Sequence, residues 1–205
     1  MKRPNEEIVD SEPAPRKRGA RKQADTPRKE FTRLKLNGTV YEAGDVVVIK
    51  EHHDDRCFGT IVHIWSQAKG QAFIHIRWFY KPSDVFRTTV PSFIGADELF
   101  DSDHEQDVHV HAVYDKVRVL SFEEYFNKPE IEEDVFFSRA RYLPTLSQLV
   151  PPIEDWPTVC VCKAVKSPND VYVECEQCGG LYHFPCVSLS QENVDRDWIC
   201  QDCRH

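Results

Sequence analysis

Alternating apolar and polar positions dominate the middle of the chain, in short stretches separated by turn-forming residues. The longest alternation, over residues 71–80, repeats an apolar or aromatic side chain at Ala72, Ile74, Ile76, Trp78 and Tyr80. A period of two places those side chains on one face of a β-strand. Shorter strand-like runs cover residues 45–50, 57–65, 115–120 and 134–142, without long amphipathic helix patterns between them. We therefore predict a mainly β domain, a small barrel or curled sheet, over residues 37–145.

Charge changes the picture at the N-terminus. The 205-residue chain has a formal net charge of −8, but its first 36 residues hold 11 basic and six acidic residues. Because this segment has few large apolar residues to offset the entropy of ordering, we predict a disordered basic tail over residues 1–36. Its cluster of basic residues at positions 16–18, 21 and 22 is typical of a nuclear localisation signal. Weak contact with nucleic acid and a merely solvated tail are the alternatives.

The rest of the composition argues against several classes of protein. An acidic body disfavours sequence-unspecific DNA binding, which depends on many neutralised phosphates, and it suits a basic partner. No apolar run reaches the roughly 18 residues of a membrane span, and the polar, charged N-terminus is unlike a secretory signal. We therefore expect an intracellular protein without a membrane partner.

Seven of the eight cysteines lie in the last 50 residues. An intracellular chain would not keep them as disulfides, and their spacing is that of metal ligands. With one histidine they form four pairs: Cys160 and Cys162, Cys175 and Cys178, His183 and Cys186, Cys200 and Cys203. Zinc takes four thiolate or imidazole ligands, so eight ligands predict two closed structural Zn²⁺ sites and no catalytic metal. Metal binding must also supply much of the folding free energy of so short a segment.

The order of these ligands resembles that of a PHD finger. Four cysteines precede the histidine, three cysteines follow it, and Trp198 stands two residues before Cys200. A RING finger would have its histidine fourth, and a LIM domain would spread its ligands differently. The resemblance implies a linker over residues 146–157, a PHD-type finger over residues 158–205, and Trp198 packed beneath the second site. It also implies a cross-brace, in which Cys160, Cys162, His183 and Cys186 hold one ion and Cys175, Cys178, Cys200 and Cys203 hold the other.

PHD fingers as a family read histone tails, and the tail adds as a strand beside the segment that precedes the third ligand. In this chain that segment alternates polar and apolar residues, and its Asp170, Tyr172 and Glu174 are the predicted peptide contacts. Trimethyl-lysine readers of the family usually carry aromatic residues where this chain has Val159 and Leu181. The resemblance therefore favours an unmodified tail, another ligand or a structural role over trimethyl-lysine reading by the finger.

The β segment resembles a second family, the BAH (bromo-adjacent homology) domain. The runs that carry this resemblance cover residues 45–49, 61–65, 77–82, 98–104, 116–119 and 134–137, and their order and spacing match the family over nearly all of residues 38–145. A BAH domain followed closely by a PHD finger is similar to the plant and fungal BAH–PHD chromatin readers linked to Polycomb-type repression.

The BAH resemblance implies an aromatic cage for methyl-lysine. Phe58, Trp78 and Tyr80 occupy the three cage positions of the family, and aromatic faces around a quaternary ammonium attract it through cation–π interactions. His104 falls where the family has a histidine that touches the peptide backbone. The carboxylate expected two residues later is replaced by Gln106, so the next residue, Asp107, becomes the candidate peptide contact.

Purely structural roles are the alternative for two sets of these residues. Aromatic residues on strands usually pack in the core, which is the alternative for this trio. His63 and His75 also lie on predicted strands, and we interpret them as structural histidines, not ligands.

Together these features predict a nuclear, non-enzymatic chromatin protein that reads methylated histone H3 tails of the nucleosome through its BAH cage. The Polycomb-type repressive mark and a role in gene silencing follow from the resemblance, with the finger as a second tail-binding or structural module. One alternative is a scaffold subunit that binds other chromatin-complex subunits without reading methyl-lysine. A RING-like ubiquitin ligase is another, against which the positions of His183 and Trp198 speak.

Overall fold

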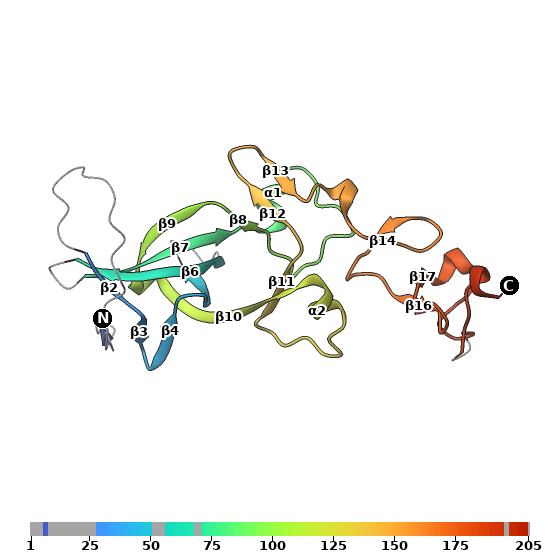
Figure 1. Cartoon of the computed structure of the whole chain (residues 1–205), viewed down its shortest axis with the longest axis horizontal. Coiled ribbons are helices and arrows are strands. Elements are labelled where there is room, and N and C mark those ends of the chain that lie inside the picture. The colour runs from blue at the N-terminus through green and yellow to red at the C-terminus, as the bar shows by residue number, and fades with distance from the viewer. Residues whose placement is uncertain (1–5, 8–27, 51–55, 68–70, 195–196, 205) are drawn as a thin grey trace.

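The computed structural model describes residues 6–7, 28–50, 56–67, 71–194 and 197–204. A β-rich module lies at the N-terminal side of the molecule, and a small finger forms its C-terminal end (Figure 1). The predicted localisation cluster at residues 16–22 lies outside the described residues. Within them, no helix is long and apolar enough to cross a membrane.

A seven-stranded sheet forms the larger module, in the order β11-β10-β5-β6-β7-β9, with β2 also paired to β6. Its strands are β2 (Lys29–Phe31), β5 (Val46–Lys50), β6 (Arg56–Ser66), β7 (Ala72–Phe79), β9 (Glu105–His109), β10 (Val113–Ser121) and β11 (Val135–Ser138). All pairs are antiparallel except β10 with β11. The predicted mainly β fold is confirmed.

The face predicted from the alternation in residues 71–80 is the core face of β7. Ile74 and Ile76 are fully buried there and pack in one cluster with Ile49 and Ile61 of the neighbouring strands. The opposite face of the sheet holds a second cluster, in which Phe79 packs. The sheet is thus covered on both faces over much of its length, which explains its Val- and Ile-rich strands.

Smaller elements complete this module. One three-stranded sheet consists of β1 (Glu6–Glu7), β3 (Arg33–Leu36) and β4 (Thr39–Glu42), and a second of β8 (Asp101–Ser102), β12 (Arg141–Leu143) and β13 (Gln148–Val150). The helices are α1 (Pro82–Val85), α2 (Phe122–Phe126) and the 3-10 turn η1 (Val110–Ala112). Helix α2 begins at a capping box, in which Ser121 and Glu124 satisfy each other's backbone N–H groups.

The prediction of disorder up to residue 36 is wrong for its last part. Residues 29–36 form β2 and β3, and Leu34 and Leu36 are buried in the main core. The composition of residues 1–36 is dominated by charged residues, so it gave little weight to the apolar side chains of Phe31, Leu34 and Leu36. These three side chains let the segment pair with β6 and β4.

Residues 146–157, predicted as a linker, carry β13 and the 3-10 turn η2 (Ile153–Asp155). Trp156 is buried, and Leu149 and Ile153 pack against the same cluster as Phe100 and Tyr142. This segment therefore packs on the β module, while the proposed domain limits at residues 145 and 158 stay predictions.

The finger consists of two hairpins and two short turns. Strands β14 (Thr158–Val159) and β15 (Ala164–Val165) form one hairpin, and β16 (Tyr172–Glu174) and β17 (Leu181–His183) form the other. The turns η3 (Phe184–Val187) and η4 (Gln201–Cys203) follow. So little regular structure cannot provide a large apolar core.

Candidate functional site

A pocket of about 300 Å³ opens beside the end of β7. Trp78 and Tyr80, two residues apart, present their side chains to the same face of the sheet, as the alternation predicted. Tyr80 follows the last residue of β7 and is held by a backbone bridge to Phe100. The residues that line the pocket are Cys57, Phe58, Trp78, Phe79, Tyr80, Lys81, Asp84, His104 and Gln106.

Polar contacts fix both rings of the pocket. The Tyr80 hydroxyl lies 3.0 Å from His104 Nδ1, and the Trp78 indole N–H donates to Gln106 Oε1 at 3.2 Å. The backbone N–H of Trp78 donates to the carbonyl of His104 at 2.9 Å. The rings therefore occupy set positions before any ligand arrives, which lowers the entropy cost of binding.

The electrostatics of the pocket suit a cation. Burial, aided by Tyr142 and by the charges of Asp84 and Asp103, raises the pKa of Tyr80, so its ring stays a neutral phenol near pH 7. The Asp84 carboxylate is anchored by the backbone N–H of Lys81 at 3.0 Å and lines the same pocket. Two electron-rich rings and one carboxylate can attract a quaternary ammonium group.

The structure divides the predicted aromatic trio between the two faces of the sheet. The register sets Phe58 opposite Phe79, whereas Trp78 lies opposite Gly59. Directly opposed residues of an antiparallel pair share a face, so Phe58 points into the second cluster, where its ring lies 4.7 Å from that of Phe136. Phe58 touches the pocket, but it does not stand beside Trp78 and Tyr80 as a third wall. Cys57 of β6 packs in the same cluster as those two rings and also lines the pocket.

The predicted peptide contacts at and just before β9 (Glu105–His109) are also divided. His104 lies at the pocket, and so does Gln106, the residue that replaces the expected carboxylate. Asp107 points to the other face, where it accepts from the Trp65 indole at 3.1 Å and pairs with His75 at 2.8 Å. Strand alternation explains this, because neighbours on β9 cannot both face the pocket. Asp107 therefore does not line the pocket, and its prediction as a peptide contact beside the cage is corrected.

The eight predicted zinc ligands gather in two groups, in the cross-braced order that the PHD resemblance implies. One group is Cys160, Cys162, His183 and Cys186, and the other is Cys175, Cys178, Cys200 and Cys203. Within each group the sulfur and imidazole donor atoms lie within 4.8 Å of one another. Four soft donors at such separations fit tetrahedral Zn²⁺ without an open position, so the finger has two structural zinc sites.

Backbone groups prepare the thiolates. Burial raises the pKa of Cys160, but backbone N–H groups of Cys162 and His183 outweigh it and bring the pKa to about 6. The pKa of Cys175 is also about 6, because N–H groups of Cys200 and Cys178 outweigh burial there. His183 turns Nδ1 toward Cys162 Sγ at 3.4 Å and Nε2 toward Asp170 at 3.5 Å. A carboxylate behind a ligating imidazole fixes its orientation.

Trp198 packs as predicted. It is buried in a cluster with Cys175 and Cys200, and its ring lies 5.3 Å from that of Tyr182. The indole therefore supports the second site from within.

The predicted peptide edge of the finger is partly used by internal contacts. The Tyr172 hydroxyl accepts from the Ser167 N–H at 2.9 Å, and Asp170 faces His183. Glu174 is exposed. A second hollow, of about 460 Å³, is lined by Val159 and Leu181 with Tyr182 and Asp202. It has aliphatic walls where a methyl-lysine reader would have aromatic ones.

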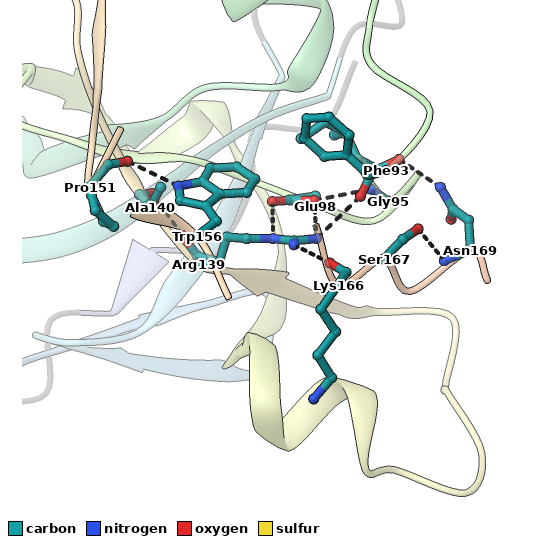
Figure 2. Close-up of polar contacts among 12 residues, drawn as sticks. Phe93, Gly95, Glu98, Arg139, Ala140, Pro151, Trp156, Lys166, Ser167 and Asn169 are labelled. Atoms are coloured by element: carbon teal, nitrogen blue, oxygen red, sulfur yellow. Dashed lines mark hydrogen bonds and ion pairs between the residues drawn. The ribbon is translucent and has the colours of Figure 1, made fainter. Parts of the chain in front are cut away.

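A buried ion pair joins the finger to the β module (Figure 2). Arg139 donates to both carboxylate oxygens of Glu98, at 2.8 and 3.0 Å, and to the Lys166 carbonyl of the finger at 2.8 Å. Glu98 is 0% exposed and the Arg139 side chain 6%. Burial raises the pKa of Glu98, which Arg139 and the Gly95 N–H counteract.

Two further contacts strengthen this junction. The Asn169 amide of the finger donates to the carbonyls of Ser92 and Ile94, at 2.9 and 2.8 Å. Gly95 leaves room for the finger, because a Cβ atom there would lie 2.9 Å from Pro168. The sequence analysis did not predict this junction. The sequence feature that could have indicated it is Arg139, an arginine directly after the apolar run of β11.

Comparison with known proteins agrees with both modules. The family description for the BAH domain matches residues 39–152, and that for the PHD-finger matches residues 160–203. Two relatives from Arabidopsis thaliana match over most of the chain. Chromatin remodeling protein EBS is 27% identical over 90% of this chain and 80% of its own length. Chromatin remodeling protein SHL is 29% identical over 86% of this chain and 79% of its own length.

A crystal structure of the yeast Rsc2 BAH domain covers 58% of this chain and 53% of its own chain, with 19% identity and a TM-score of 0.50. At this identity the likeness shows the fold alone. The BAH match spans more than half of the sequence, and the finger match contains all eight zinc ligands. The chain therefore belongs to the BAH-domain family, with a PHD finger following the BAH domain.

Proposed function

We propose that the chain is a non-enzymatic chromatin-binding protein whose BAH pocket holds a methylated lysine of a histone H3 tail. The observation that carries this proposal is the pocket at the end of β7, where Trp78 and Tyr80 share a face and Asp84 adds a negative charge. Quaternary ammonium groups are recognised by such aromatic surfaces. The names of the two Arabidopsis relatives support chromatin as the setting.

The BAH pocket has two aromatic walls on one face, so its selectivity rests on fewer rings than the sequence suggested. We propose that His104 and Gln106, which contact the Tyr80 and Trp78 side chains, also contact the peptide backbone beside the lysine. The Polycomb-type repressive mark, and with it gene silencing, stays our proposal for the lysine that is read. A nuclear location follows from a chromatin partner.

For the finger we propose a second tail-binding or structural role. The exposed Glu174 and the strand β16 could bind a basic, extended peptide, while the hollow at Val159 and Leu181 has a single aromatic lining residue, Tyr182. We assign the eight clustered cysteine and histidine donors of the finger as its zinc ligands.

A second candidate is a scaffold subunit that binds other chromatin-complex subunits. The displacement of Phe58 to the other face favours it, because a two-walled pocket binds a cation less tightly than a complete cage. The test below separates the two candidates.

Titration of fluorescent H3 peptides, each trimethylated at one lysine or unmodified, tests the proposal on the full chain. We expect micromolar binding to one trimethylated peptide, and loss of that binding in Trp78→Ala. Tyr114→Ala is the matched control, because this ring is 58% exposed and lies outside the pocket. Phe58→Leu should weaken binding far less than Trp78→Ala, since the Phe58 ring packs on the other face.

Equal binding of methylated and unmodified peptides would favour the scaffold. Circular dichroism of each variant would separate lost binding from lost folding.

A further inference from the structure

Three polar side chains form a row across the sheet, on the face opposite the pocket. His63 on β6 lies directly opposite His75 on β7, and His75 lies directly opposite Asp107 on β9. Directly opposed residues on adjacent strands have Cβ atoms about 5 Å apart. The register alone therefore brings together three side chains that are distant in sequence.

The donor atoms of this row are close enough to share one ion. One ligand atom from each of His63, His75 and Asp107 lies within 4.8 Å of the other two. His75 Nδ1 is 2.8 Å from Asp107 Oδ1, and the two imidazole rings stack with centroids 4.5 Å apart. The His75 and Asp107 side chains are 23% and 33% exposed, so the row is open to solvent on one side.

The surroundings favour a dication. Glu105 Oε2 lies 3.2 Å from His75 Nε2, and Glu30 adds negative charge near His63. Burial first, and then the neighbouring His75, lowers the pKa of His63, which keeps that imidazole neutral and its lone pair available. Arg28 lies 3.7 Å from Asp107 and stacks on the Trp65 ring at 4.1 Å, so it offsets part of the negative charge.

The carboxylate is held from behind. The Trp65 indole N–H donates to Asp107 Oδ1 at 3.1 Å, and the Trp65 ring is itself stacked on Phe73. Such outer partners orient the ligands of metal sites.

We propose that His63, His75 and Asp107 form a third metal site, for Zn²⁺ or a similar divalent transition-metal ion, separate from the two zinc clusters of the finger. Two imidazoles and one carboxylate are a ligand set for such ions. The fourth position would be open to water or to Glu105. The site would tie together β6, β7 and β9 on the face opposite the pocket. The sequence pattern favoured structural histidines here, because no local spacing links ligands from three strands.

The competing account is that His75 only hydrogen-bonds to Glu105 and Asp107, with no metal. To separate the two, full-length protein that already holds two zinc ions would be titrated with Zn²⁺ against a competing chelating dye. We expect a third equivalent to bind, and His63→Asn and His75→Asn each to weaken it at least about tenfold. His111→Asn is the matched control and should leave the third equivalent unchanged.

Uptake of only two equivalents by the wild type, or a third equivalent unaffected in both variants, would overturn the proposal. A second readout does not depend on the folding of any variant. Co²⁺ added to the zinc-loaded wild type should shift or broaden the ring signals of His63 and His75 in NMR spectra, without a thiolate charge-transfer band. Unchanged ring signals would equally overturn the site.

Discussion

The BAH domain and the finger reach their folds by different routes. The BAH domain buries a continuous apolar core, in which Val47, Ile49, Ile74 and Ile76 are fully inaccessible. Among the described residues, the hydrophobic cluster of the finger has four buried members, and two of these, Cys175 and Cys200, belong to one of the clusters that we assign to zinc. The first fold depends on burial, and the second on metal.

Their binding surfaces differ in the same way. The BAH pocket presents the aromatic rings of Trp78 and Tyr80, whereas the corresponding hollow of the finger has Val159 and Leu181. Because of this difference, we expect methyl-lysine recognition in the BAH domain and not in the finger. The buried Arg139, paired with Glu98, donates to the Lys166 carbonyl and so connects a domain with an apolar core to a finger that we expect to need zinc.

Loss of a zinc ligand should have the largest effect, and it should affect the finger and not the BAH domain. Structural zinc contributes on the order of 10 kcal/mol to small zinc folds, so Cys200→Ser should unfold the finger and lower the bound zinc. The apolar core of the BAH domain should persist. Zinc analysis together with two-dimensional NMR would show both effects.

Cys57→Ser is the matched control, because this cysteine lies outside both clusters. If the BAH domain unfolded together with the finger in Cys200→Ser, the claim that the two domains are stabilised independently would be contradicted.

Arg139→Met tests the junction. It leaves the fully buried Glu98 without its cation, and loss of one partner of a buried pair costs about 3–5 kcal/mol. Because burial already raises the pKa of Glu98, removing Arg139 should raise it further. Glu98 would then take up a proton in the folded state, so the loss of stability should be large at pH 7.5 and shrink toward pH 5.

Denaturant unfolding at the two pH values measures this effect. The double variant Arg139→Met with Glu98→Gln should recover part of the stability at pH 7.5. A loss that does not vary with pH would argue that packing of the guanidinium on Phe122, at 3.9 Å, is the dominant contribution.

Asn169→Ala should weaken the junction more mildly. It removes two hydrogen bonds to the carbonyls of Ser92 and Ile94, at a cost of about 1–3 kcal/mol. Thermal unfolding would measure the cost. Asn193→Ala is the control, since the Asn193 side chain accepts from the Ser190 N–H at 2.7 Å within the finger. Equal shifts in the two variants would remove the argument for a specific contact.

Tyr80→Phe should have the smallest effect. It keeps the ring and removes only the hydroxyl that contacts His104. We expect peptide affinity to fall by about twofold to fivefold, because one exposed hydrogen bond contributes roughly 0.5–1 kcal/mol. A complete loss of binding would mean that the hydroxyl, and not the aromatic face, is the main contact.

Local patterns predicted much of this molecule. The alternation in residues 71–80 predicted the core face of β7. The spacing of the cysteines predicted eight metal ligands, and the PHD resemblance predicted how they divide into two groups. The pairing register of the strands was not predictable from the sequence. It determines which face of the sheet Phe58 and Asp107 occupy, because a shift of one residue moves a side chain to the other face. The Arg139 junction was missed for a related reason, since its partners lie 41 and 27 residues away in the chain.

The most direct test of the BAH pocket separates charge from shape. The trimethyl-lysine of the best-bound peptide would be replaced by its neutral tert-butyl analogue, and both peptides titrated against the full chain. If Trp78 and Tyr80 attract the cation, the charged peptide should bind about fivefold to thirtyfold more tightly, a difference of roughly 1–2 kcal/mol. Equal affinities for the two peptides would contradict cation recognition by this pocket.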